Sequence, residues 1–66
     1  MTARVGNLVY IPSSTNLMKY ESTYPVKVHC LASPASVLIM EEKENQFGVL
    51  FEGEVWYVDK KKVYNA

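Results

Sequence analysis

The beginning of this 66-residue chain combines a short apolar run with a segment that has no regular spacing. Leu8 to Ile11 are aliphatic or aromatic, follow a Gly6-Asn7 pair and end at Pro12, which is typical of a strand. Residues 12–25, PSSTNLMKYESTYP, show neither a period of two nor one of about 3.6 residues. We therefore predict a first strand at 8–11 and a long loop over 12–25.

A second strand is predicted from the alternation of side chains in VKVHCLA, residues 26–32. The alternation places Val26, Val28 and Cys30 on one face and His29 on the other. Free cysteine usually packs as a small hydrophobic residue, so we expect the first face to be buried, with Cys30 in the core. We expect His29 to be exposed.

Residues 34–47 allow two interpretations. The Ser33-Pro34 pair suits the start of a helix, because proline is tolerated in the first turn. However, Val37 to Met40 are consecutive apolar residues, and glutamates occupy the positions that would continue a helical stripe. These glutamates are Glu41, Glu42 and Glu44. We favour a strand over 37–40 followed by KENQ as a polar turn, and the helix stays open as the alternative.

A hairpin is predicted where residues 47–52 and 55–58 flank Gly53-Glu54, because glycine at the first loop position suits a type II′ turn. A two-residue turn at these positions puts Glu52 opposite Val55. It also gives the hairpin one uniformly apolar face, which we expect to form the core. That face consists of Val49, Phe51, Trp56 and Val58.

The end of the chain, DKKKVY, predicts a single helical turn and a final short strand. Asp59 is placed to cap the turn formed by the three lysines, and Val63-Tyr64 returns as the last strand. The lysines then lie on a surface connector.

This layout resembles the small SH3-like β-barrel. The resemblance rests on a first strand in VGNLVYIP, a long polar excursion, central strands with short turns, and the ending GEVWYVDKKKVY. It implies one all-β domain over residues 1–66, a barrel of about five antiparallel strands with a long loop after the first strand and a 3₁₀ turn before the last. The chain lacks the acidic-aromatic motif of eukaryotic peptide-binding SH3 domains, so polyproline recognition is not implied. Other SH3-like modules bind partners that range from proteins to RNA.

In its size, charge and single cysteine, the chain is also similar to short orphan proteins of large bacteriophages. That similarity implies a protein that binds and alters a host protein in the host cytoplasm.

The composition limits the partners and the compartment. Seven Lys and Arg residues balance seven Asp and Glu residues, so no net field attracts a nucleic acid. The one cysteine forms no internal disulfide, which favours a reducing cytoplasm. The longest apolar run has four residues, 37–40, so we expect neither a signal peptide nor a membrane span.

No catalytic or metal-binding group is expected. His29 and Cys30 are neighbours on a strand and therefore point to opposite faces, where they cannot share one ion. A nucleophile also needs a base and an orienting group, but the chain has only one histidine and no nucleophile motif around its serines. We predict that the protein is not an enzyme and needs no cofactor.

The second face of the hairpin, formed by Leu50, Glu52, Val55 and Tyr57, suggests a binding surface. Not all of its apolar residues fit inside so small a barrel, so either the 12–25 loop folds across them or a partner does. We predict that the partner is a protein, because tyrosine and leucine on a rigid strand suit such contacts. The predicted protein-binding residues are Leu50, Val55, Tyr57, Tyr20 and Tyr24.

Two alternatives stay open. A nucleic acid could be bound through Lys60, Lys61, Lys62 and Tyr64, by phosphate contacts and base stacking. A homo-oligomer could form by pairing of strand edges, as a self-assembling structural protein.

Overall fold

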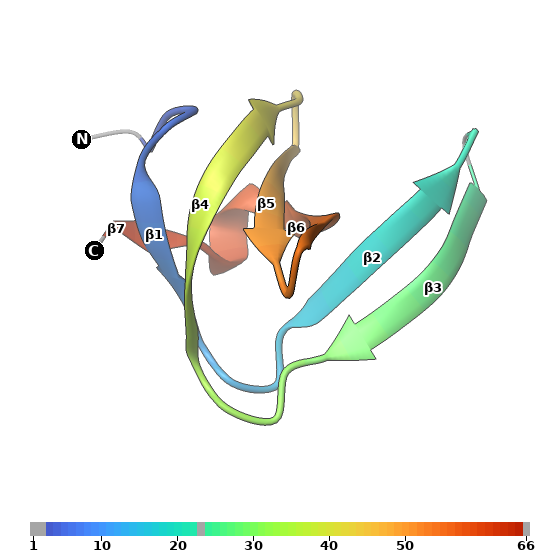
Figure 1. The fold of residues 1–66 in the computed structure, drawn as a ribbon, viewed down its shortest axis with the longest axis horizontal. Helices are drawn as coiled ribbons and strands as arrows, with labels where there is room; N and C mark the ends of the chain where they lie inside the picture. The colour runs from blue at the N-terminus through green and yellow to red at the C-terminus, as the bar shows by residue number, and fades with distance from the viewer. Residues whose placement is uncertain (1–2, 23, 66) are drawn as a thin grey trace.

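The computed structural model describes residues 3–22 and 24–65, which form one antiparallel sheet of seven strands in the order β3-β2-β6-β5-β4-β1-β7 (Figure 1). The elements are β1 (Leu8–Ile11), β2 (Asn16–Glu21), β3 (Tyr24–Cys30), β4 (Ala35–Glu42), β5 (Gln46–Phe51), β6 (Glu54–Asp59), the 3₁₀ turn η1 (Lys60–Lys62) and β7 (Tyr64–Asn65). The all-β prediction is confirmed. The first strand has the predicted bounds, and residues 34–47 contain β4 and the start of β5, so the helix alternative is wrong.

The inner face of the sheet encloses the core. Its buried residues come from five strands and from the segment after β3, and they are Val9, Ile11, Leu17, Leu31, Val37, Ile39, Phe47, Val49, Trp56 and Val58. Three of the four residues predicted for the core face of the hairpin are therefore buried, and Phe51 is half-buried against them. Because successive side chains of a strand alternate, the remaining residues of β5 and β6 face outward.

The predicted loop over 12–25 is wrong, because it contains β2 and the start of β3. The two strands pair from Asn16↔Cys30 to Glu21↔Tyr24, with a bulge between Lys19 and Tyr20. Among residues 16–20 of β2, only Leu17 is fully buried. The strand is therefore held mainly by backbone pairing, which leaves no hydrophobic period in the sequence.

The predicted burial of one β3 face is also wrong. Val26, Val28 and Cys30 are exposed. The β2–β3 hairpin extends away from the rest of the sheet, so only residues at its base reach the core (Figure 1). His29 is exposed as predicted, and its ring lies 5.4 Å from that of Phe51.

The turn between β5 and β6 is shifted by one residue from the prediction. Phe51 pairs with Glu54, so the loop residues are Glu52 and Gly53, with φ angles of 53° and 80°. Two positive φ angles are characteristic of a type I′ turn, whose twist matches that of the strands. Moving the turn by one residue changes the cross-strand partner of each residue by two positions. Because side chains alternate with a period of two, the residues predicted to share a face still do.

Replacing Glu52 with asparagine is expected to stabilise the protein by about 0.5 to 1 kcal/mol. Asparagine adopts positive φ more readily than glutamate, and Asn-Gly is the favoured type I′ pair. Urea unfolding followed by circular dichroism measures the change. Gly53→Ala is the opposing control, since alanine is strained at a φ of 80°. An unchanged midpoint for Glu52→Asn would show that the turn is not of this type.

The chain ends with a short turn and strand close to the prediction. The three lysines form η1, and the backbone N–H of Val63 donates to the Lys60 carbonyl oxygen at 3.2 Å. Asp59 precedes the turn, but its side chain makes no capping hydrogen bond. The last strand is Tyr64–Asn65 rather than Val63-Tyr64, and it pairs with β1.

Candidate protein-docking face

Apolar side chains form a row across the outer face, which is the face turned away from the core. The register pairs Leu8 with Leu38, Leu38 with Leu50, and Leu50 with Val55. These residues therefore lie side by side on β1, β4, β5 and β6. Leu8 is 60% exposed and Leu50 is 39% exposed, so the row is open to solvent.

A second row continues from β6 to the edge of the sheet. Tyr57 pairs with Gly48 on one side and with Met18 on the other, and Met18 pairs with Val28. The two rows meet on β6, where Val55 and Tyr57 are two residues apart. We call the combined set the outer band: Leu8, Leu38, Leu50, Val55, Tyr57, Met18 and Val28. It reaches from β1 to β3.

Gly48 makes room for the Tyr57 ring. A Cβ atom at this position would lie 3.0 Å from Tyr57 Cε1 and 3.3 Å from Val55 Cγ1. The φ of Gly48 is not in the left-handed region, so the glycine is needed for close approach rather than for an unusual backbone. The ring of Tyr57 thus lies over the backbone of the neighbouring strand.

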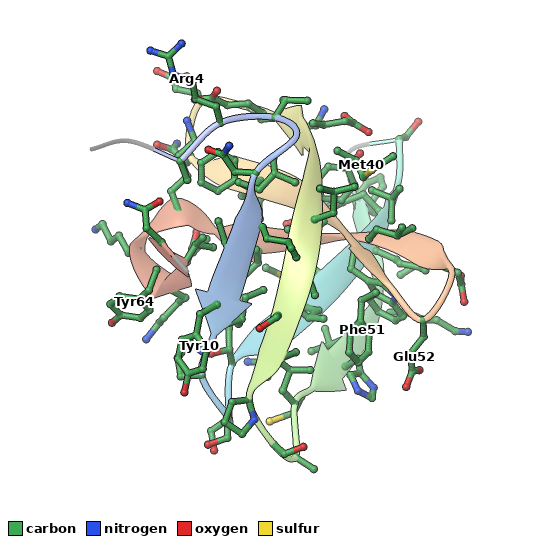
Figure 2. The ribbon with its side chains drawn as sticks, turned by 60° about the vertical axis from the view of Figure 1, so that its left-hand side comes forward. Arg4, Tyr10, Met40, Phe51, Glu52 and Tyr64 are labelled. Atoms are coloured by element: carbon green, nitrogen blue, oxygen red, sulfur yellow. The ribbon has the colours of Figure 1, made fainter. Side chains whose placement is uncertain are left out.

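A β-bulge places Glu41 beside the same glycine. Ile39 pairs with Val49, but the next pair is Glu41 with Gly48, so Met40 is the extra residue. Met40 projects from β4 at the surface (Figure 2). Bulges redirect side chains in this way. Glu41 and Tyr57 therefore flank Gly48, and the Tyr57 hydroxyl donates a 2.8 Å hydrogen bond to Glu41 Oε2.

Two further side chains complete the surroundings of the Tyr57 ring. The Tyr20 ring meets it edge-on with the centroids 5.7 Å apart, and Lys43 Nζ lies 5.4 Å from its centroid. Tyr20 is held in turn by Gln46, whose Nε2 donates to the tyrosine hydroxyl at 2.9 Å. Aromatic pairs in this geometry contribute about 0.5 to 1.5 kcal/mol beyond area burial.

An open hollow lies against the two rings. It has a volume of about 370 Å³ and is lined by Tyr20, Ser22, Lys43 and Tyr57. Its walls come from the β2–β3 hairpin, the β4–β5 turn and β6. The hollow offers aromatic surface with a positive charge at one side.

Lys19 ties the β2–β3 hairpin to β6 and so positions Tyr20. Its Nζ lies 2.7 Å from Glu54 Oε1 and 4.9 Å from the centroid of the Trp56 ring, and it donates to the Val55 carbonyl oxygen at 3.3 Å. The hydrogen bond and the charge of Lys19 hold the pKa of the Glu54 carboxyl below its usual value. The hairpin is thereby fixed at its inner face, while Tyr20 lies on the outer one.

The structure brings together four of the five residues predicted to bind protein: Leu50, Val55, Tyr57 and Tyr20. Tyr24 is 73% exposed but lies opposite Glu21 near the hairpin turn, outside the residues that line the hollow. The alternative in which 12–25 folds across the whole face is wrong: Met18 and Tyr20 adjoin Tyr57, but β2 pairs beside β6 and leaves Leu50 exposed.

Sequence reasoning missed Gly48, Glu41, Lys43 and Gln46. Only Gly48 leaves a signal in the sequence, as a glycine inside a strand that otherwise reads as apolar. The contacts of the other three depend on the bulge and on the β4–β5 turn.

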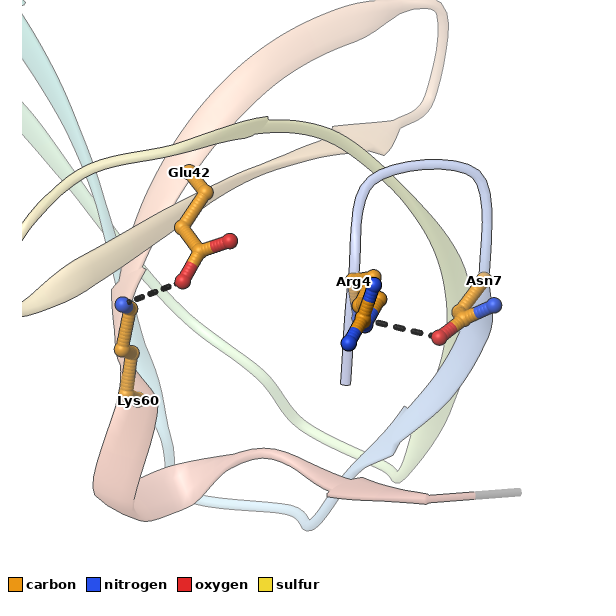
Figure 3. A network of polar contacts seen from close by, with 4 residues as sticks. All are labelled: Arg4, Asn7, Glu42 and Lys60. Atoms are coloured by element: carbon orange, nitrogen blue, oxygen red, sulfur yellow. Dashed lines mark hydrogen bonds and ion pairs between the residues drawn. The ribbon is translucent and has the colours of Figure 1, made fainter. Parts of the chain in front are cut away.

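The residues of the nucleic-acid alternative do not form one positive surface. Lys60 Nζ is 2.8 Å from Glu42 Oε2, so its charge is paired (Figure 3). In the same view the backbone N–H of Arg4 donates to Asn7 Oδ1. Lys60 and Lys61 line a second hollow together with two acidic residues, Glu44 and Asp59. Tyr64 lies beside Tyr10 at the other edge of the sheet, with the ring centroids 6.4 Å apart (Figure 2).

Among the described residues, no three His, Cys, Asp or Glu side chains gather where they could hold a metal ion. Residues 3–22 and 24–65 also contain no helix that is long and apolar enough to cross a membrane. Comparison with protein-family models, with curated proteins and with solved structures found no match to this chain.

The Tyr57 phenol is expected to titrate above the ordinary pH range of a tyrosine. The hydrogen bond to Glu41, with partial burial and the Glu41 charge, raises its pKa above the ordinary value of about 10. The resulting contribution to stability is fully present below about pH 10 and is lost as the pH rises through the raised pKa. A titration of tyrosinate absorbance checks this. Tyr57→Phe should remove the late phase, and Glu41→Gln should bring it closer to the ordinary value. A late phase that survives Tyr57→Phe would contradict the assignment.

Proposed function

We propose that this chain is a non-enzymatic protein-binding module with an SH3-like β-barrel fold. The fold proposal is supported by the order of the elements: a first strand, a hairpin excursion, three consecutive antiparallel strands, a 3₁₀ turn and a short last strand. The sequence resemblance described above implies the same order except at the excursion, where it implies a long loop and the structure has the β2–β3 hairpin. A fold of this kind does not select a function, so the functional proposal rests on the outer face.

The observation that carries the proposal is the Tyr20–Tyr57 hollow beside exposed apolar residues of the outer band. Tyrosine and leucine side chains on strands provide contact area for a partner. The entropic cost is small here because hydrogen bonds already hold the Tyr20 and Tyr57 rings in place. The partner we propose is an extended protein segment. Its apolar side chain packs on the Tyr20 and Tyr57 rings, and a nearby carboxylate pairs with Lys43.

The similarity to short bacteriophage proteins extends this proposal to a host protein as the partner. Binding would alter the host protein by occupying the surface that carries the docked segment. No chemistry on the bound protein is required.

Tyr57→Ala is expected to weaken binding of such a segment by about tenfold or more, since it removes the central aromatic contact. Peptides selected from a displayed random library on the immobilised protein are the probe, and their affinities are measured by fluorescence anisotropy. Leu50→Ser, at an exposed position, should weaken the same peptides without affecting the fold. Lys61→Ala on η1 is the matched control and should leave their affinities unchanged.

Circular dichroism of each variant separates loss of binding from loss of fold. Selected peptides that bind Tyr57→Ala and Leu50→Ser as tightly as the parent would reject the outer face as the docking site. A library that yields no binding peptide would reject recognition of an extended segment.

A further inference from the structure

The outermost strand, β3, has a partner on one side only. In the order of the sheet it pairs with β2, and no other described strand lies beyond it (Figure 1). At its C-terminal end the Leu31 N–H donates to the Thr15 carbonyl oxygen at 3.0 Å. Antiparallel ladders alternate, so Val28 and Cys30 direct their backbone N–H and C=O groups away from β2. These groups form a free pairing edge.

The exposed edge is apolar and carries little protection. Val26 is 54% exposed, Val28 is 62% exposed, and both lie on a seven-residue strand. Natural edge strands are usually blunted by charges, prolines or bulges. Here Pro25 and the bulge, whose extra residue is Val26, lie toward the turn, and Lys27 is the one lysine of the strand. The half of β3 from Val28 to Cys30 has no such device.

We propose that β3 pairs antiparallel with β3 of a second copy of this chain, with Val28 opposite the partner's Val28. Centring the pair on Lys27 would place two lysines directly opposite each other, which is destabilising. Moving the centre by one residue brings Lys27 opposite the partner's His29. It also brings the outward backbone groups of Val28 into register with those of the partner's Val28.

This register continues a pattern already present within one chain. The second row of the outer band runs from Tyr57 through Met18 to Val28 and ends at the edge. In the dimer it passes directly into the partner's Val28, so two outer bands become one continuous surface. Exposed apolar area at Val26 and Val28 is covered at the same time.

A second copy is the occupant that the edge fits best. The same short strand serves both sides of a two-fold interface, so no further surface is required. The net charge of zero means that two copies do not repel each other. One strand pair covers less than the roughly 800 Å² per partner of a standard interface, so the dimer should dissociate on dilution.

Sedimentation velocity across a range of protein concentrations tests the dimer. The parent chain should change from monomer to dimer as concentration rises, and Val28→Lys should stay monomeric because it sets two lysines against each other. Leu50→Lys is the control. It also replaces an apolar residue with lysine, but Leu50 lies away from the β3 edge, so this variant should dimerise like the parent. A parent chain that stays monomeric at millimolar concentration, or a Val28→Lys variant that still dimerises, would overturn the proposal.

The register is tested by a single cysteine substitution. In the proposed pairing Val26 lies opposite the partner's Cys30, so Val26→Cys should give a cross-linked dimer under copper phenanthroline and air. Within one chain positions 26 and 30 are about 13 Å apart along the strand and cannot be bridged. The variant Val26→Cys with Cys30→Ser should cross-link far less. Equal cross-linking of the two variants would reject this register.

Discussion

Replacing Ile39 with alanine is expected to lower the free energy of unfolding by about 2 to 5 kcal/mol. Ile39 is fully buried on the inner face of β4, opposite Val49. Its backbone also joins the sheet to the turn before β1, since its N–H donates to Asn7 and its carbonyl accepts from Gly6, at 3.0 and 2.8 Å. A domain of this size has a total stability near the low end of about 5 to 15 kcal/mol, so the variant should be largely unfolded at moderate temperature.

Leu50→Ala is the matched control, because it removes the same number of carbon atoms from the neighbouring strand. Leu50 lies on the outer face and is 39% exposed, so we expect a loss below about 1 kcal/mol. Thermal unfolding followed by circular dichroism compares the two variants. Equal losses would mean that Leu50 is covered in solution and that the inner and outer faces have been assigned incorrectly.

Several strands were predictable because burial and turn chemistry both leave signals in the sequence. Residues 8–11 are bounded by a turn pair and a proline, and the alternation at 55–58 sets the core face of the hairpin. The faces were predicted correctly although the turn was not, because moving the turn by one residue changes each cross-strand partner by two positions and so keeps the same residues on each face. The sequence signal for the turn was ambiguous because Gly53 suits either a type I′ or a type II′ loop.

The β2–β3 hairpin was not predictable in the same way. Its sequence alternation at 26–30 is real, but the apolar side of it faces solvent and the polar side carries His29 against Phe51. Alternation identifies a strand and its two faces, whereas the choice of the buried face depends on what the strand packs against. Because only the base of the hairpin reaches the core, the hydrophobic pattern of its other residues does not indicate which face is turned toward the core.

The candidate site was predictable in its strand residues and not in its details. The same parity that puts Trp56 inside puts Val55 and Tyr57 outside, so the sequence indicates them directly. The contacts of Tyr57 depend on the bulge at Met40, which has no distinct sequence signal. Without that extra residue, Met40 would lie opposite Gly48 and the hydroxyl of Tyr57 would have no carboxylate beside it.

Gly48→Ala is expected to destabilise the protein by about 1 to 3 kcal/mol, although alanine is ordinarily better than glycine in a strand by about 0.5 to 1 kcal/mol. The added Cβ would lie 3.0 Å from Tyr57 Cε1 and 3.2 Å from the Cβ of Glu41. The ring therefore has to move off the glycine, which weakens the hydrogen bond from Tyr57 to Glu41. The late tyrosine phase in the absorbance titration should shift toward the ordinary pKa in this variant.

A double-mutant cycle isolates the contact between the ring and the glycine. In a Tyr57→Ala background the ring is absent, so Gly48→Ala should be close to neutral, and the two substitutions should couple by about 1 to 3 kcal/mol. Urea unfolding of the parent, both single variants and the double variant provides the four free energies. If the cost of Gly48→Ala is the same with and without the ring, the clash lies with Glu41 or Val55 and not with Tyr57. The close approach of the Tyr57 ring to β5 would then result from the arrangement of the surrounding residues and would not determine that arrangement.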